Sequence, residues 1–309
     1  MPYLFGHFKE KITPDGEQVY ISVSKNGLDW IEVNGGNPIL ESTIGEKGCR
    51  DIEIVKLKNG GFVILTTDLS IAYRMDENYQ VNWKEVNSTG SKCLCMWKTD
   101  DMINFSEQKR IYFGRDDFGC MWAPEVFYDE INDEYMIHWG STIKDDNYTH
   151  MSIYCSKTKD FESFTYPELF FTKNNEILDT HIVKVNGVYH MFYKDCLEPS
   201  KNMHATATNL HGPYENDEKF AEFMLTLEKP WAYEAPTTLT LPDGRWCLMI
   251  DFFGCAKEDM GYVPFISSKP GDSNFALATE SFSFPYGFKH GGIVEITDEE
   301  YDKILNHYN

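Results

Sequence analysis

Four short segments of the chain each place a carboxylate beside aromatic, basic or small residues, directly before an apolar stretch. They are Arg50-Asp51, Trp122-Ala123-Pro124-Glu125, Leu178-Asp179-Thr180-His181 and Tyr233-Glu234-Ala235-Pro236. Two carboxyl groups can divide the roles of general acid and general base, and hydrolysis of a glycosidic bond uses such a pair. If the fold brings the segments together, they form a rigid, aromatic-walled acidic pocket that suits a sugar. Acids that recur as turn or strand caps are the structural alternative.

The elements that carry these segments are repeated hairpins. One type is an apolar strand, a polar turn and a second apolar or aromatic strand, and it occupies residues 52–68, 125–141, 181–195 and 236–251. The other type is a strand, a short turn and an aromatic residue, and it occupies residues 19–33, 93–111, 152–171, 203–214 and 262–277. Repeats at this spacing are typical of a propeller, in which each blade covers the apolar face of its neighbour.

The two hairpin types occur in unequal numbers, and a closed ring explains why. Strands at residues 3–8 and 292–296 are expected to pair and to supply the missing hairpin. The sequence therefore predicts an all-β protein: a single five-bladed β-propeller catalytic domain over residues 1–309, with a short C-terminal helix. That helix begins with a capping box, Thr297 and Glu300. A β-sandwich is the alternative fold. In a propeller the innermost strands line a central channel, so the four acidic segments should converge at one mouth of it.

Charge and composition exclude several classes of partner. Lys and Arg number 28 and Asp and Glu number 49, which gives a net charge of −21. Such a surface repels nucleic acid and anionic membranes but is compatible with neutral sugars. A phosphorylated or polyuronate substrate would need a local basic cluster, and none is visible in the sequence. No stretch reaches transmembrane length.

The eight cysteines form neither a CxxC pair nor any metal-ligand spacing, and we expect them to be reduced and mostly buried. The first residues, Met1-Pro2-Tyr3-Leu4-Phe5, do not resemble a signal peptide. The expected location is therefore cytoplasmic.

Taken in order, the motifs resemble those of glycoside hydrolase family 43, the arabinofuranosidase and xylosidase family, over nearly the whole chain. The matching segments are Arg50-Asp51, Trp122-Ala123-Pro124-Glu125, Asp179 in LDTHIV, Glu234 in EAPT, FYKD at 192–195, KHGGIV at 289–294 and ITDEEY at 296–301. The resemblance implies a five-bladed propeller and inversion at the anomeric carbon. Carried over by position, Asp51 is the general base, Glu234 is the general acid, and Asp179 holds Glu234 and raises its pKa.

Two positions depart from the family pattern. Ile52 stands where the family has Pro after the base, and Ala235 stands where it has Gly after the acid. Loss of the proline should loosen the turn that presents Asp51, and Glu53 is the nearest substitute for the base. The Cβ atom of Ala235 should be a small change.

Further residues are predicted to contact substrate or to wall the pocket. They are Trp122, Glu125, Asp68, Trp97, His181, Tyr233 and His290. Packing between blades is the alternative role for Trp122, and a hydrogen-bonded core position is the alternative for His290. In some relatives the histidine at this position lies near a bound calcium, so the resemblance leaves a structural calcium open. Calcium prefers oxygen ligands, and we predict no metal ligand set and no required cofactor.

The function predicted from these observations is an inverting glycoside hydrolase. It would release terminal pentosyl residues from oligosaccharides, as an α-L-arabinofuranosidase, a β-xylosidase or both. A phosphorylase-type propeller is the first alternative, but it needs a basic cluster, whereas Arg50, Lys194, His181 and His290 are scattered in the sequence. Fructosidase-type propellers have Cys after the acid, where this chain has Ala. A non-catalytic sugar-binding propeller is disfavoured because all three acids are present.

Overall fold

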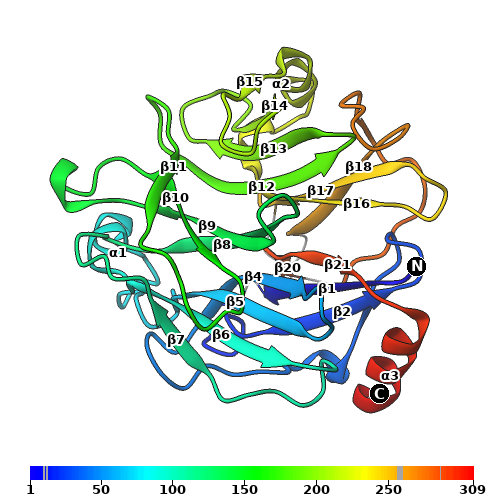
Figure 1. The fold of residues 1–309 in the computed structure, drawn as a ribbon, viewed down its shortest axis with the longest axis horizontal. Coiled ribbons are helices and arrows are strands. Elements are labelled where there is room, and N and C mark those ends of the chain that lie inside the picture. Colours follow the sequence, from blue (N-terminus) through cyan, green and yellow to red (C-terminus); the bar gives the residue numbers. More distant parts are fainter. Residues whose placement is uncertain (10, 12, 256–259, 286) are drawn as a thin grey trace.

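The computed structural model is a ring of five antiparallel blades around a central channel, and it describes residues 1–309 except 10, 12, 256–259 and 286. The innermost strands of the blades surround the middle of the molecule in Figure 1. The prediction of an all-β five-bladed propeller with a C-terminal helix is therefore confirmed.

Four blades are simple up-and-down meanders in which strand order follows chain order. The second blade comprises β4 (Cys49–Lys56), β5 (Phe62–Asp68), β6 (Cys93–Thr99) and β7 (Lys109–Tyr112). The third comprises β8 (Trp122–Asp129), β9 (Glu134–Ser141), β10 (Ser152–Thr158) and β11 (Glu168–Phe171). The fourth comprises β12 (Ile177–Val185), β13 (Val188–Asp195), β14 (Asn202–Ala207) and β15 (Glu215–Asn216). The fifth comprises β16 (Tyr233–Thr240), β17 (Trp246–Phe252), β18 (Gly261–Ser267) and β19 (Ala276–Leu277).

The first blade closes the ring by joining the two ends of the chain. It contains β1 (Tyr3–Lys9), β2 (Tyr20–Ser24), β3 (Ile31–Glu32), β20 (Phe288–Lys289) and β21 (Ile293–Glu295). β1 pairs with β2 on one edge and with both β20 and β21 on the other. The pairing runs from Tyr3 with Glu295 to Phe5 with Ile293, as the ring-closure argument predicted.

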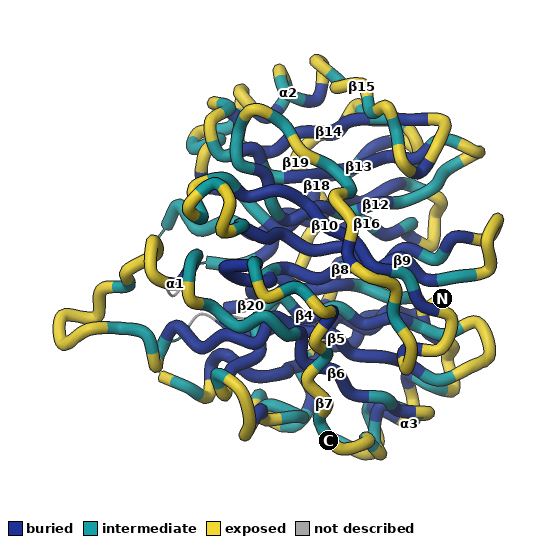
Figure 2. Tube along the Cα trace, turned by 60° about the vertical axis from the view of Figure 1, so that its left-hand side comes forward, coloured by how far each residue is buried: buried dark blue, intermediate teal, exposed yellow. Residues whose placement is uncertain are grey.

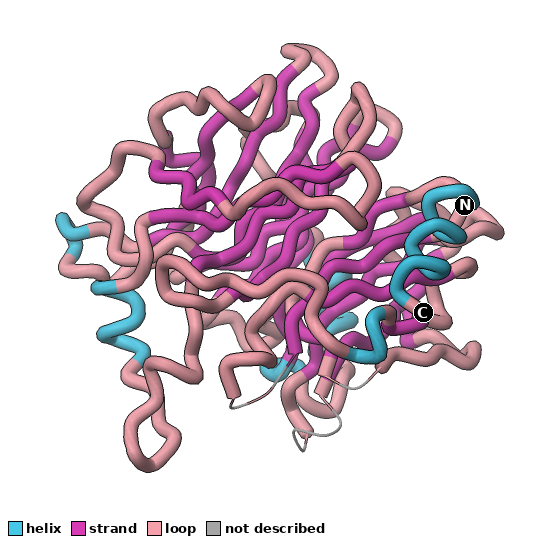
Figure 3. Tube along the Cα trace, turned by 90° about the horizontal axis from the view of Figure 1, so that it is seen from below, coloured by secondary structure: helices cyan, strands magenta, loops and turns pink. Residues whose placement is uncertain are grey.

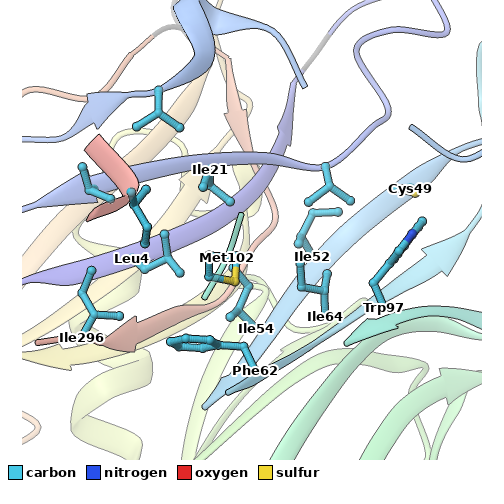
Figure 4. Packing of buried hydrophobic residues seen from close by; sticks show 14 of the residues in the cluster. Leu4, Ile21, Cys49, Ile52, Ile54, Phe62, Ile64, Trp97, Met102 and Ile296 are labelled. Atoms are coloured by element: carbon cyan, nitrogen blue, oxygen red, sulfur yellow. The ribbon is translucent and has the colours of Figure 1, made fainter. Parts of the chain in front are cut away.

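Five apolar clusters fill the core, one between each pair of neighbouring blades, and a sixth, smaller cluster of Leu69, Ile71 and Val86 lies between β5 and β6. The inner strands of the blades are mostly buried, whereas the outermost strands and the connecting loops carry most of the exposed residues (Figure 2). Figure 4 shows the cluster between the first two blades, where Leu4 and Ile21 face Ile52, Ile54 and Ile64. Because every blade depends on both neighbours for burial, the ring is one cooperative unit.

In the described residues, three α-helices and three 3₁₀ turns lie between or after the strands, and α3 is at the periphery (Figure 3). They are α1 (Trp83–Thr89), α2 (Glu218–Leu225), α3 (Asp298–Tyr308), η1 (Asn34–Gly36), η2 (Lys144–Asp146) and η3 (Pro230–Ala232). The predicted capping box of α3 is present, with Thr297 and Glu300 bonded reciprocally. Sequence reasoning missed α1 and α2, although Asn82 and Asp217 cap them. In the described part of the chain, no helix is long and apolar enough to cross a membrane.

A β-bulge interrupts the innermost strand of four blades at the same place. In each bulge one residue adopts positive φ, and these residues are Asp51, Ala123, Asp179 and Ala235. A bulge re-aims the neighbouring side chains, so these positions turn toward the channel mouth. In the first blade the gap between β20 and β21 occupies the corresponding place. There a Cβ atom on Gly291 would lie 1.8 Å from the carbonyl oxygen of Gly6, so only glycine fits.

Candidate active site

The bulges open onto a cavity of about 410 Å³, which lies within the ~300–1,000 Å³ range of small-molecule sites. It is lined by Arg50, Asp51, Leu69, Trp83, Trp122, Leu178, Asp179, Lys194, Glu234, Phe253, Met260, Lys289 and His290. Three of the lining residues are the carboxylates assigned to catalysis from the sequence. Trp122 and His290, both predicted to contact substrate, line the same cavity.

Asp51 is held on one side of the cavity by two side chains. The Thr67 hydroxyl donates to its Oδ2 atom over 2.7 Å, and Nδ1 of His290 lies 3.2 Å from its Oδ1 atom. Burial alone would raise the pKa of Asp51, but the charge and hydrogen bond of His290 outweigh it and lower the pKa to about 2. Asp51 is therefore ionised at neutral pH, as a general base must be.

The missing proline at position 52 does not leave the Asp51 bulge loose. The Ile52 N–H donates to the His290 carbonyl over 3.2 Å, and the Gly292 N–H donates to the Ile52 carbonyl over 2.7 Å. A proline could not make the first of these bonds. This pairing across the first and second blades stiffens the turn by another route, and it keeps Asp51 rather than Glu53 in the pocket wall.

Asp179 occupies the equivalent bulge position in the fourth blade and is 6% exposed. Burial raises its pKa to about 6, and the nearby charges of Glu234 and Asp51 add to that effect. His290 and Lys194 act in the opposite direction without cancelling it. Asp179 therefore titrates closer to neutral pH than an ordinary aspartate.

His290 is a buried cation between two carboxylates. Its Nδ1 atom lies 3.2 Å from Asp51 and 3.8 Å from Asp179. Burial lowers its pKa, but Asp179 and Asp51 together raise it to about 9. Among the residues that the structure describes, no group of three or more His, Cys, Asp or Glu side chains is arranged to hold a metal ion. The donors at His290 thus do not fit a calcium bound directly by side chains, and the imidazolium itself supplies positive charge there.

Glu234 lies between two ammonium groups. Lys194 Nζ is 2.5 Å from its Oε2 atom, and Lys289 Nζ is 3.9 Å from its Oε1 atom. Burial raises the pKa of Glu234, but the two lysines outweigh burial and lower the pKa to about 2. The like charge of Asp179 does not give Glu234 a raised pKa in the free protein, because the two lysines, which sequence reasoning did not place beside the acid, outweigh it.

A second ion pair, between Lys289 and Asp251, lies beneath Glu234. Lys289 Nζ lies 2.5 Å from Oδ2 of the fully buried Asp251. Burial raises the pKa of Asp251 to about 6, against the opposing charge of Lys289. Both lysines also make cation–π contacts with Phe253. The Nζ atoms of Lys194 and Lys289 lie 5.4 and 5.7 Å from the centre of its ring.

Cationic side chains that are dispersed in the sequence gather in this cavity. Arg50, Lys194, Lys289 and His290 all line it. The expectation that the chain offers no local basic cluster is therefore wrong. The strands β4, β13 and β20 carry three of these residues, and no sequence spacing relates them. Each cation has a carboxylate within 4 Å; for Arg50 this is Glu17, 2.8 Å away.

An insert between β5 and β6, residues 69–92, supplies an aromatic wall that sequence reasoning missed. Trp83, the first residue of α1, lines the cavity and packs edge-on to Trp122, with ring centres 6.1 Å apart. Its side chain remains 51% exposed. The buried carboxylate of Glu17 anchors the insert by accepting hydrogen bonds from Ser70 Oγ and from the N–H groups of residues 71 and 72. Only the helix cap at Asn82 could have signalled it.

Glu125 and His181 lie further along the innermost strands and are not in the cavity lining. His181 Nδ1 is 3.0 Å from Glu125 Oε2, and its Nε2 is 2.9 Å from Thr238 Oγ1. The four acidic segments are therefore not equivalent. Asp51 and Asp179 share the bulge position, whereas Glu234 lies one residue before it and Glu125 two residues after it.

Three other predicted pocket residues also lie outside the lining. Asp68 is buried, and it accepts hydrogen bonds from Arg110 Nε and from the Ser91 hydroxyl. Trp97 belongs to the core cluster between the first two blades. Tyr233 is buried against Phe252, with ring centres 4.8 Å apart. All three belong to strand β5, β6 or β16 but face packing partners, which alternation alone does not distinguish from the channel.

Comparison with known proteins agrees with this geometry. A family model for glycosyl hydrolase 43-related proteins, described as a probable glycosyl hydrolase domain, matches residues 1–302. An α-L-arabinofuranosidase of Bifidobacterium longum is 22% identical over 201 residues, which are 58% of this chain and 18% of that protein. The chain thus spans less than a fifth of the length of this curated relative.

Solved structures share the fold at low identity. A family 43 β-1,3-galactosidase with galactodeoxynojirimycin superposes with a TM-score of 0.60 and 14% identity, covering 91% of this chain and 92% of that one. The catalytic domain of a family 62 α-L-arabinofuranosidase from Coprinopsis cinerea gives a TM-score of 0.53 and 13% identity, covering 78% and 70%.

Proposed function

The chain belongs to the glycosyl hydrolase 43-related family, and from this premise we propose that it is an inverting glycoside hydrolase that releases terminal pentosyl residues from oligosaccharides. The observation that carries the proposal is the meeting of Asp51, Asp179 and Glu234 in one cavity, each with a different electrostatic partner. Carboxylates in unlike environments can hold unlike protonation states, which acid–base catalysis of glycoside cleavage requires.

Asp51 is proposed to activate the attacking water. It is ionised and has the Thr67 hydroxyl and His290 fixing its two oxygens, so its orientation is set before substrate arrives. A carboxylate prepared in this way can accept a proton from water beneath the anomeric carbon.

Glu234 is proposed to protonate the leaving oxygen, with Asp179 as a positioning residue close to both Glu234 and His290. The lysine contacts keep Glu234 ionised in the free protein. Donation therefore requires that substrate binding change the partners of Lys194.

The pentosyl specificity rests on the arabinofuranosidase relative and on the cavity. The B. longum relative is named for its action on α-L-arabinofuranosides. A cavity of about 410 Å³ suits one sugar ring with part of a second. Trp122 and Trp83 offer apolar faces on which a sugar ring can pack.

The test is hydrolysis of 4-nitrophenyl α-L-arabinofuranoside and β-D-xyloside, with the β-D-galactoside included, by wild type and by Glu234→Gln. Wild type should release nitrophenol from at least one pentoside. The variant should lose more activity on natural oligosaccharides than on the aryl glycosides, because nitrophenol leaves without acid assistance. Proton NMR of the first product anomer checks inversion, and a retained anomer would contradict it. Full variant activity on oligosaccharides would refute the role of Glu234.

Phosphorolysis is the second candidate. The sequence alone disfavoured it because the basic residues are scattered along the chain, but four cations meet in the cavity and could bind phosphate. Release of sugar by wild type in 10 mM phosphate, compared with phosphate-free buffer, distinguishes the two reactions. A strict phosphate requirement with sugar 1-phosphate as product would establish phosphorolysis.

A further inference from the structure

Two lysines lie beside Glu234, and a neutral sugar brings no negative charge to balance them when Glu234 becomes protonated. Both Lys194 and Lys289 line the cavity, and both are largely buried, with side chains 16% and 4% exposed. If Glu234 takes up the proton that a general acid needs, Lys194 loses its contacting carboxylate, 2.5 Å from its Nζ atom, and keeps only the more distant charge of Asp179. An ammonium group left unpaired at a buried site is strongly unfavourable.

An anion brought by the substrate resolves this conflict. The leaving sugar must approach Glu234 to be protonated, so it also approaches Lys194 Nζ on the same wall. A substrate carboxylate at this position would form an ion pair with the Lys194 ammonium group in place of Glu234. A neutral hydroxyl could accept a hydrogen bond from it but could not balance its charge. Glu234, freed from Lys194, would remain near Asp179 and Asp251, whose like charges favour its protonated form.

We propose that the leaving-group side of the cavity is an anion subsite, in which Lys194 and Lys289 receive a carboxylate or phosphate group of the substrate and thereby release Glu234 to take up a proton. The inference rests on the proposed function, since it assumes that Glu234 meets the leaving group. Binding adds one negative charge and one proton, so the charge of the buried cluster is unchanged.

The net charge of the whole chain narrows the substrate class. At −21 the surface repels polyanions at long range, while the local lysine pair attracts a single anionic group at short range. The favoured substrate is therefore a short glycoside whose leaving sugar carries one acidic group, rather than a polyuronate chain.

Calorimetric titration of the whole protein tests the subsite without turnover. The ligands are D-glucuronate and D-galacturonate, their neutral counterparts D-glucose and D-galactose, and inorganic phosphate. The proteins are wild type, Lys194→Met, Lys194→Arg, Glu234→Gln and, as a matched control, Lys58→Met, which alters a surface lysine paired with Asp133. Each titration is run at pH 7 in two buffers of different ionisation enthalpy, which reports proton uptake.

Wild type and Lys58→Met should bind a uronate at least tenfold more tightly than the neutral sugar, with uptake of about one proton. Lys194→Met should lose this preference, and Lys194→Arg should keep most of it, which separates lost charge from lost folding. Glu234→Gln should bind the uronate several-fold more tightly and without proton uptake, because the internal competitor of the ligand has been removed.

Phosphate binding with the same dependence on Lys194, without uronate binding, would support the anion subsite and assign it to phosphate. Equal affinity for uronates and neutral sugars, including no measurable binding of either, would overturn the proposal. Weaker anion binding by Glu234→Gln would also overturn it. Anion binding without any glycosidase activity would instead refute the proposed hydrolysis, so the two failures are distinguishable.

Discussion

Two tiers of charged groups lie along the same channel, and they differ in whether cationic side chains contact their carboxylates. The upper tier, Asp51, Asp179 and Glu234, faces the cavity and has His290, Lys194 and Lys289 within 4 Å of its oxygens. The lower tier, Glu53, Glu125 and His181, lies further along the strands. Glu53 accepts a hydrogen bond from the Val126 N–H over 3.2 Å, and no cationic side chain is paired with it among the described residues.

The difference shows that burial alone does not decide the charge of a carboxylate here. Burial raises the pKa of Glu53 well above its usual value, and the nearby Glu125 raises it further. Burial acts in the same direction on Asp51, yet the imidazolium of His290, which is hydrogen-bonded to Asp51, reverses the outcome. The upper tier is thus ionic and poised for proton transfer, whereas the surroundings of Glu53 favour its neutral form.

The largest expected effect is the loss of the base in the upper tier. Asp51→Asn should lower kcat/KM by about 10²–10⁴-fold, since the amide cannot accept a proton from water. Steady-state kinetics on the best aryl glycoside measures the loss.

The matched change in the lower tier is Glu53→Gln, which should leave kcat/KM within about threefold of wild type. A comparable loss in both variants would mean that the tiers do not divide as described, and that Glu53 takes part in catalysis.

Removal of the upper-tier cation should appear in stability as a function of pH. The folded-state pKa of His290 is about 9 and its ordinary value is 6.5. Its contribution is fully present below about pH 6.5 and is lost as the pH rises through 9. His290→Gln should therefore lower the free energy of unfolding at pH 6, by at most on the order of 3 kcal/mol.

Denaturant titrations of wild type and His290→Gln at pH 6, 8 and 10 measure this difference. The carboxylates whose charge acts on or is affected by His290 are Asp51, Asp179, Glu125, Glu53, Glu234 and Asp251. In the variant Asp51 keeps the hydrogen bond from Thr67 but loses the imidazolium. A gap between the two proteins that stays constant to pH 10 would show that His290 does not act as a cation.

The exposed rim of the cavity should affect binding more than chemistry. Trp83→Ala should raise KM roughly three- to tenfold with kcat nearly unchanged, because an apolar ring face no longer packs on the sugar. Trp231 is similarly exposed, at 54%, but does not line the cavity, so Trp231→Ala is the control. Equal effects of both variants would remove Trp83 from the binding site.

The smallest expected effect is that of Glu53→Gln on stability. Because the folded-state pKa of Glu53 is raised, its stabilising contribution is present below about pH 4.5 and declines as the pH rises toward the folded-state value. The variant should match wild type within about 0.5 kcal/mol near pH 5 and equal or exceed it at pH 8. A large loss at both values would show that Glu53 is ionised in the folded protein.

Much of this architecture could be predicted from the sequence, because a propeller repeats its pattern. The hairpins, the ring closure at Tyr3 and Glu295 and the capping box of α3 follow from alternation and local chemistry. The three carboxylates of the upper tier were found because each stands directly before the apolar stretch of an innermost strand.

The remaining features depend on information that a repeat pattern does not contain. A bulge shifts facing by one residue, so Glu125 and Glu234 seemed equivalent to Asp51 although they are not. Lys194, Glu234 and Lys289 belong to three different blades, and they come together only because the blades pack around the channel. Neither sequence spacing nor composition predicts these contacts. Trp83 reaches the cavity on an insert, residues 69–92, that the repeat pattern does not predict.

The segment that completes the first blade also carries two residues of the cavity. Lys289 and His290 sit at the junction of β20 and β21, which pair with β1 near the opposite end of the chain. A ribosome must therefore have released residues 1–290 before these two cations can reach Asp51 and Glu234. Until then Asp51 lacks its imidazolium partner and Glu234 has only Lys194, so the charge balance of the cavity is completed only after the fifth blade has been synthesised.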